Sequence, residues 1–473
     1  MTQSYDVRRS DWFIVALALV GVCATRAVEK SNVAIFVVIL VLAVIFVATI
    51  IWSRNRKLSV LLLVVFAGLS FLIGARALRD LRDVEIGQYS GVARVISDPQ
   101  RSGAATQIVL DITGDRFVVY AYGPVAWRLA QVSVGEQIIV SGWRNRLPSV
   151  QAKRWMSRHV KGKFEIETVE ERRLTAAPLF RSAQRIRKLV NVGAESFPFD
   201  ERSLFTGLVI GDDSKQPKEM ITAFRKSGLA HLVAVSGQNV AFILAGLSPL
   251  LKRLAQPLRL FVTCSVLVWF VVITRVEPSV VRAAVMAGIA TLSISIGRPT
   301  RTLRLLALTV IITILIDPLL AWSVGYFMSV GATAGLSLGS GPLARVIPGP
   351  RWLALLIGAT VSAQIGVTPA VAFVFGLPTA IGIFTNVLAV PVASLVMLFG
   401  MPLSLFAGML SETVFSAFGS IIMWPVLIGV RWVWWVAALG AHLSSTGMVN
   451  LGLWIAVFGV ILLLLHRGAR VEG

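Results

Sequence analysis

Apolar runs of about 20 residues recur along this chain, and each is long enough to cross the hydrocarbon core of a bilayer as a helix. Only 15% of the 473 residues are charged, whereas a soluble globular protein carries about 25%. One buried core cannot accommodate so many apolar runs. The sequence therefore predicts an α-helical polytopic membrane protein.

The connections between these runs carry clustered basic residues. About twelve runs can be placed, and with the N-terminus inside, every basic cluster falls on the cytoplasmic side, as the positive-inside tendency requires. Both termini are then expected in the cytoplasm, with the long polar stretch 84–227 outside the cytoplasmic membrane. The runs are 12–25, 32–52, 58–75, 228–250, 258–274, 279–296, 303–320, 323–340, 352–374, 379–408, 414–438 and 448–466.

Four regions follow from this pattern: N-terminal helices over 1–83, an inserted domain over 84–173, an amphipathic segment over 174–227 and a polytopic part over 228–473. The inserted domain alternates polar and apolar residues in about five short runs separated by turn residues, which predicts a small extracytoplasmic all-β barrel of OB-like form. From residue 178 to 192 the apolar spacing becomes helical, with basic residues on the other face. This pattern predicts a basic helix that lies in the outer membrane interface.

OB-like barrels often hold single strands through a basic groove and stacking aromatic side chains. Trp127, Trp143 and Trp155 are candidate stacking residues here. A structural cap with a solvated basic face remains an alternative for this domain. The candidate DNA-binding cations of the barrel are Arg144, Arg146, Lys153, Arg154 and Arg158, with Lys161 and Lys163 nearby.

The most informative stretch runs from Leu208 to Val240 and enters the predicted membrane part with His, Ser, Gly, Gln and Asn side chains together. Polar groups at membrane depth are costly unless they face water or a partner. Irregular backbone is tolerated in a bilayer only where it is buried in protein or lines a water-filled cavity. The stretch therefore indicates a polar path through the membrane, with ordinary hydrogen bonding between helices as the alternative.

The run from Gly228 to Gly237, with the sequence GLAHLVAVSG, resembles the hallmark of the ComEC family of competence DNA uptake proteins. Three further pieces are similar to that family in the expected order. They are EPSVVRA from Glu277 to Ala283, GYFMS from Gly325 to Ser329, and TNVLAVP from Thr385 to Pro391.

Three features differ from the family pattern. Asn239 stands where a His is frequent, and Phe327 where a Gln is common. The sequence ends at Gly473 and is expected to be a short form without the metallo-β-lactamase-like domain of many members. Its four histidines do not have the spacing of a dinuclear metal site. We therefore expect neither an enzyme nor a bound metal or cofactor.

The resemblance implies a channel that passes single-stranded DNA across the cytoplasmic membrane during natural transformation. Such a path must hydrate a polyanion along its length. An outer DNA receptor, a cytoplasmic translocase motor and a competence pilus are the implied partners, together with membrane lipids. The residues that would line the path are His231, Ser236, Gly237, Gln238, Asn239, Arg282, Ser329, Gln364 and Asn386, and Arg225, Lys226 and Arg275 would attract phosphates at its outer mouth.

Several of these residues have structural alternatives. Arg282 could pair with Glu277, Asn386 could hydrogen-bond a helix break near Pro391, and Gln364 could bridge helices. Two other functions also remain open for the whole chain. One is a secondary transporter of a small anionic solute or lipid, which would use the interrupted helices. The other is a scaffold whose barrel binds a partner.

Overall fold

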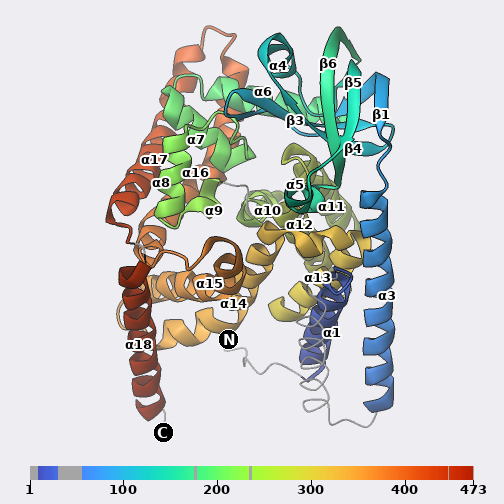
Figure 1. Ribbon diagram of the computed structural model, residues 1–473. Helices are drawn as coiled ribbons and strands as arrows, with labels where there is room; N and C mark the ends of the chain where they lie inside the picture. The colour runs from blue at the N-terminus through green and yellow to red at the C-terminus, as the bar shows by residue number, and fades with distance from the viewer. Residues whose placement is uncertain (1–8, 30–55, 175–177, 234–236, 446, 472–473) are drawn as a thin grey trace. The chain divides into compact units, whose positions relative to one another are not determined.

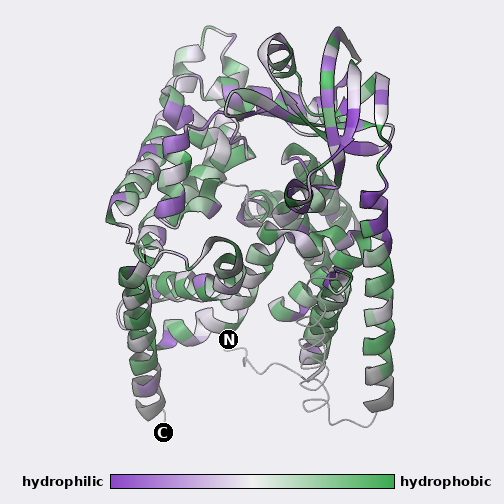
Figure 2. Cartoon of the chain, viewed as in Figure 1, coloured by the Kyte–Doolittle hydropathy of each residue, from purple (hydrophilic) through white to green (hydrophobic). Residues whose placement is uncertain are grey.

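The computed structural model describes residues 9–29, 56–174, 178–233, 237–445 and 447–471. It is mostly helical, with one small β domain, and divides into two compact units (Figure 1). The first unit comprises Met1–Arg181 with Pro299–Ser323, and the second comprises Ser182–Arg298 with Val324–Gly473. Figure 2 shows that the helices are largely hydrophobic, whereas hydrophilic residues are frequent on the strands.

Outside its β domain, the described part of the first unit contains three long helices: α1 (Arg9–Arg26), α3 (Arg56–Arg82) and α13 (Thr302–Ile316). α1 and α3 run parallel, because Gly21 lies against Phe66 while Thr25, one turn later, lies against Gly74. The predicted run 32–52 between them lies outside the described residues.

α1 and α13 also run parallel. Near their N-terminal ends Asp11 lies 3.8 Å from Arg304, and beyond their C-terminal ends Glu29 accepts a 3.0 Å hydrogen bond from Trp322. Trp322 ends the short 3-10 helix η2 (Pro318–Trp322), which follows α13. The C-terminal ends of α1 and α13 therefore lie on one side of this unit.

The β domain begins directly after α3. Its strands are β1 (Gly87–Val95), β2 (Gln100–Ser102), β3 (Ala105–Ile112), β4 (Asp115–Ala121), β5 (Gln137–Arg146) and β6 (Val160–Leu174). The sheet order is β1-β5-β6-β4-β3-β2, and β1 also pairs with β3, so that five strands close a barrel. All pairs are antiparallel except β4 with β6.

This pairing is that of an OB-fold, with β2 as an extra hairpin strand on β3 and the helix α4 (Gly123–Leu129) between the third and fourth barrel strands. Alternate residues of each strand point inward, as the strand period of two requires. Ile108 and Leu110 on β3, Phe117 on β4 and Phe164 on β6 are fully buried in this interior. The predicted barrel is confirmed as a fold.

The second unit is helical and begins with α6 (Pro178–Gly193), the predicted amphipathic helix. Its apolar face packs on α16, since a Cβ on Gly193 would meet the carbonyl oxygen of Ser404. The other helices are α7 (Phe199–Ile210), α8 (Lys218–Lys226), α9 (Ala230–Val233), α10 (Gly237–Leu251), α11 (Gln256–Ile273), α12 (Pro278–Ser295), α14 (Val324–Val346), α15 (Arg351–Phe375), α16 (Gly382–Leu410), α17 (Ser416–Leu443) and α18 (Gly447–Val471).

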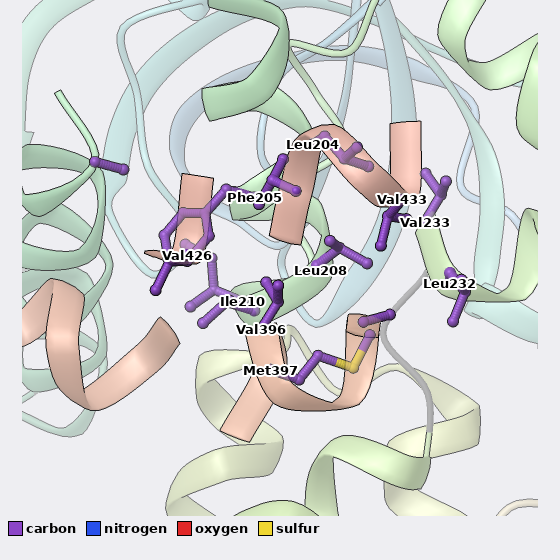
Figure 3. Close-up of a cluster of buried hydrophobic side chains, with 14 of the residues drawn as sticks. Leu204, Phe205, Leu208, Ile210, Leu232, Val233, Val396, Met397, Val426 and Val433 are labelled. Carbon is purple, nitrogen blue, oxygen red and sulfur yellow. The ribbon is translucent and has the colours of Figure 1, made fainter. Parts of the chain in front are cut away.

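A hydrophobic core joins α7, α9, α16 and α17 (Figure 3). Leu204 and Leu208 of α7, Leu232 and Val233 of α9, and Val433 of α17 contribute to it. The run from Leu204 to Ile210 is buried all round, which explains why α7 shows no amphipathic pattern. This core includes Leu229, Leu232 and Val233 of the signature stretch, Gly228–Gly237.

α14 and α15 pack through small residues. Gly331 and Gly335 of α14 face Gly366 and Ser362 of α15 so closely that a Cβ on either glycine would lie 2.2 Å or less from a backbone oxygen. Small residues spaced by four allow this close approach of helices in membrane proteins.

Every predicted apolar run within the described residues coincides with a helix or a pair of short helices. Among those residues, six helices are both long and apolar enough to span a membrane, and α10, α13 and Gly447–Leu463 are shorter apolar helices. The described residues thus form a mostly helical protein with six candidate membrane-spanning helices and an inserted barrel, and the number of crossings remains a prediction.

Candidate functional site

The signature stretch begins at the C-terminal end of α8. The Leu229 N–H donates to Phe224 O at 2.9 Å and the Gly228 N–H to Arg225 O at 3.3 Å, which together form a Schellman motif. Gly228 takes the left-handed conformation that this motif requires, with φ +77°. The chain therefore leaves α8 in a fixed direction, and Arg225 and Lys226 remain exposed at the end of α8.

The turn at Gly228 is held by α16 and α17. The Thr385 hydroxyl donates to Ser227 O at 2.7 Å. A Cβ on Gly440 of α17 would lie 2.8 Å from the Ser227 Cβ, and a Cβ on Gly228 would lie 2.8 Å from the Gly382 Cα. Gly382 and Thr385 of α16 and Gly440 of α17, all distant in sequence from Gly228, thus meet this turn.

Gln364 and Asn386 lie beside the same turn. A Cβ on Gly382 would be 2.5 Å from Gln364 Nε2, while Gln364 Oε1 is buried and has no hydrogen-bond partner among the described residues. Asn386 is buried and donates to the carbonyl oxygen of Gly382 one turn back in its own helix. The alternative of a hydrogen bond at a helix break near Pro391 is not what the structure shows, because Asn386 bonds to Gly382.

His231 is the second residue of α9. Leu232 and Val233 enter the hydrophobic core, whereas His231 keeps accessible surface although its imidazole lies deep in the fold beside the Gly228 backbone. Ser236, the other strongly predicted path residue, lies outside the described residues. α10 then begins at Gly237.

The first turn of α10 is tied to two other helices. Gln238 Nε2 donates to the Ser394 hydroxyl of α16 at 3.0 Å. Asn239 Nδ2 donates to Leu208 O of α7 at 3.0 Å, while Asn239 Oδ1 is buried without a partner. Asn239 is thus a buried link between helices, and Gln238 is partly exposed.

Arg282 of α12 lies next to this turn. A Cβ on Gly237 would be 3.0 Å from Arg282 Nη2. Arg282 Nε donates to the Ser329 hydroxyl of α14 at 2.9 Å, and its side chain is 5% exposed. Arg282 therefore reaches across to α14, and the alternative ion pair with Glu277 is not formed.

The predicted path residues thus fall into two groups. Gly237, Gln238, Asn239, Arg282 and Ser329 gather at the start of α10. Gln364 and Asn386 lie with Gly228 and Gly382 at the start of α16. Among the described residues, no three His, Cys, Asp or Glu side chains gather in a way that could hold a metal ion.

A buried ion-pair network that was not predicted from the sequence lies at the C-terminal end of α7. Asp212 follows α7 and lies 3.4 Å from Arg275 and 3.8 Å from Arg187. Although burial opposes ionisation, Arg275, the Ser214 hydroxyl and Arg187 together hold the pKa of Asp212 below its usual value. The Arg275 guanidinium is therefore paired with Asp212, and its side chain is 13% exposed.

The backbone that carries Arg275 is strained. Arg275 and Val276 have φ values of +62° and +59°, a region that β-branched residues rarely enter. The sequence signal for this network is Asp212, which follows the apolar residues Leu208–Ile210 and Gly211. An acidic side chain just past an apolar helix needs a partner when it is buried.

The barrel presents its tryptophans in different ways. Trp127 and Trp143 are 69% and 46% exposed, whereas Trp155 is buried against Val109 and Val118. These valines lie on the outer faces of β3 and β4, where OB-folds bind oligonucleotides. The β5–β6 connection, which contains α5 (Ser149–Trp155), thus covers that face of the barrel with its own Trp155.

The same connection docks onto the helices of its unit. Lys153 lies 3.1 Å from Glu29, and His159 Nε2 lies 3.1 Å from Asp317. The Arg158 guanidinium stacks over the Trp155 ring at 5.5 Å. The β5–β6 connection therefore links the barrel to the C-terminal end of α1 and to the start of η2.

The predicted DNA-binding cations of the barrel have different environments. Arg144 pairs with Glu85 at 2.7 Å and stacks over Tyr89, so its charge is largely engaged. Arg146, Arg154 and Arg158 are exposed.

The barrel and the apolar helices together are those of a helical membrane protein with an inserted OB-fold domain. The family described as "Competence protein" matches residues 208–468, just over half of the chain, and the chain belongs to this family. The match confirms the resemblance to the ComEC family.

One curated relative is ComE operon protein 3 of Bacillus subtilis (strain 168), which is 27% identical over 239 residues. The aligned part is 50% of this chain and 30% of that protein, so this chain corresponds to less than a third of its relative's length. No solved structure matches the chain.

Proposed function

We propose that this protein forms the path by which single-stranded DNA crosses the cytoplasmic membrane during natural transformation. Membership of the competence family supports a role in DNA uptake. The path itself is supported by one observation above all: Gly237, the first residue of α10, touches the buried Arg282, and His231 of α9 keeps accessible surface. An apolar unit needs such groups only where a polar solute passes or where helices interlock.

The barrel is proposed to lie outside the cell and both termini inside. α1, α3 and α13 run in one direction, and the barrel connects to their C-terminal ends through Glu29 and Asp317. Arg301 and Arg304 lie at the opposite end, beside Asp11. Because basic residues favour the cytoplasmic side, this arrangement supports an extracytoplasmic barrel.

We further propose that the chain works without bond-breaking chemistry and depends on partners for its driving force. An outer receptor would deliver the strand to the barrel side, a pilus would bring DNA to the cell, and a cytoplasmic motor would pull it in. In the described part of the chain, polar side chains would hydrate such a strand and basic side chains would attract its phosphates.

Substitutions at His231 and Gly237 test the proposal. His231→Ala removes the imidazole, and Gly237→Leu drives a side chain into Ala283 and Arg282. Both variants should lower transformation frequency by 10-fold or more. Gly452→Leu on α18 is the matched control, because nothing lies within 4 Å of a Cβ at that position. Membrane abundance of each variant must be measured alongside. Normal transformation in both variants would contradict the proposal.

A further inference from the structure

Arg282 is a buried cation without an acidic partner in the helical unit. Its side chain is 5% exposed, and among the described residues no carboxylate forms an ion pair with it. Its hydrogen-bond partners, the Ser329 hydroxyl at 2.9 Å and the Met286 sulfur at 3.7 Å, are both neutral. A cation buried in a membrane protein is costly, and such residues are commonly paired or mark the passage of a charged solute.

A second source of positive potential lies beside it. α10 has 15 residues, and its first N–H groups have no partner within the helix, so its start carries roughly half a positive charge. Gly237 is the first residue of α10 and lacks the side chain that would separate the helix start from Arg282. A Cβ there would come within 3.0 Å of Nη2. The Arg282 guanidinium thus lies directly against the start of α10.

The neighbouring residues orient this charge without neutralising it. Ser329 accepts from Nε and Met286 lies beside Nη1, which leaves Nη2 as the nitrogen nearest to α10. Gln238, the next residue of α10, adds a neutral amide that is held by Ser394 at 3.0 Å. A guanidinium with a fixed plane is suited to oxygen atoms arranged as in a carboxylate or phosphate.

We propose that Arg282 and the first turn of α10 form a binding site for one phosphodiester group of the strand in transit, an inference that rests on the proposed function. One guanidinium and about half a charge from a helix start together supply about 1.5 positive charges, enough to neutralise a monoanion such as a phosphodiester. A single cation also holds each phosphate only weakly, and conduction requires that a bound group can leave again.

The test uses the full-length protein in lipid nanodiscs and a labelled single-stranded oligonucleotide. Binding is measured as a function of salt concentration, and transformation frequency is measured in a host that lacks its own copy. Arg282→Gln should lower transformation 10-fold or more and reduce the slope of log affinity against log salt by about 0.7, the value for one phosphate contact in a single strand. Arg253→Gln, an equal charge change at an exposed position, should do neither.

Two further measurements keep the test decisive if Arg282→Gln folds poorly. Arg282→Lys keeps the charge and should keep the salt slope while losing part of the affinity. Strands with neutral methylphosphonate linkages should bind the wild-type protein less tightly than phosphodiester strands and should remove the difference between wild type and Arg282→Lys.

An unchanged salt slope and normal transformation in Arg282→Gln would overturn the site and leave the proposed function standing. Equal effects of Arg282→Lys on phosphodiester and methylphosphonate strands would overturn it as well. If the wild-type protein restores no transformation to the host, the proposed function itself fails, and the site fails with it.

Discussion

Gly228 and Gly382 approach each other so closely that a Cβ on Gly228 would lie 2.8 Å from the Cα of Gly382. The first glycine ends α8 and opens the signature stretch, and the second is the first residue of α16. Because α16 also supplies Thr385, whose hydroxyl binds Ser227 O, this contact fixes the signature stretch against a long apolar helix.

Gly228→Ala should be much more destabilising than Gly297→Ala. Both glycines end a helix in a Schellman motif with positive φ, so both substitutions incur about 1–2 kcal/mol of left-handed strain. Nothing lies within 4 Å of a Cβ on Gly297, whereas Gly228→Ala also collides with backbone. Thermal unfolding of the two variants in detergent should therefore separate them clearly, and equal melting temperatures would refute the contact.

Gly335→Leu should prevent α14 and α15 from packing. A Cβ at Gly335 would lie 2.1 Å from the Ser362 carbonyl oxygen, which cannot move away without displacing α15. Gly325→Leu is the control on the same helix, because a Cβ there meets nothing within 4 Å. The amount of folded protein extracted from membranes should collapse for the first variant and stay near wild type for the second. Similar yields would show that the helices do not need this close approach.

Asp212→Asn should destabilise the protein by about 3 kcal/mol, since it leaves Arg275 buried without its acid. The pKa of Asp212 lies below its usual 3.8 in the folded protein. Its stabilising effect is therefore complete above the unfolded pKa and is lost as the pH falls through the folded pKa. The melting temperatures of wild type and Asp212→Asn should differ most at about pH 5 and above and converge below pH 3.8. Glu195→Gln, at an exposed position, should show no such convergence.

Trp155→Ala should destabilise the barrel by about 3–5 kcal/mol, the usual cost of removing a buried tryptophan. Trp127→Ala removes an exposed ring and should leave stability unchanged. Limited proteolysis within residues 84–174 is a suitable readout. If Trp155→Ala instead left the barrel as resistant as wild type, the β5–β6 connection would not be packed on the face of β3 and β4.

Exposed barrel cations give a separate test of DNA binding. Changing Arg146, Arg154 and Arg158 together to Gln should weaken binding of single-stranded DNA to the full-length protein and lower its salt slope by up to about 2, at roughly 0.7 for each phosphate contact. Arg144→Gln should change the slope least, because Arg144 is paired with Glu85. An unchanged slope in the triple variant would favour the alternative of a structural cap.

Sequence patterns located the helices and the barrel well, because both depend on local periodicity. An apolar run of about 20 residues has few options other than a membrane helix, and alternation with turn residues predicts strands. The apolar face of α6 followed in the same way from helical spacing, with Ala183 and Val190 now buried. Its placement against α16 did not follow, since the sequence suggested only a membrane interface.

The candidate site was located less completely. Gly237 lies against Arg282, although the two are far apart in sequence. Asn239 donates to the carbonyl oxygen of Leu208, which is the hydrogen bonding between helices given as the alternative, whereas Asn386 donates to Gly382 within its own helix. Nothing in the sequence distinguishes an amide that lines a path from one that links helices, since both are polar residues in apolar segments.

The sequence by itself determined where helices and strands form and which family the chain resembles, because periodicity and motif are properties of neighbouring residues. Only the tertiary structure decided which polar groups are satisfied. Asp212 pairs with Arg275, and Trp155 packs on the outer face of β3 and β4. Arg282 hydrogen-bonds Ser329 and lies against the start of α10. These partners are distant in the chain, and the energy of a buried polar or charged group depends on what the fold brings to it.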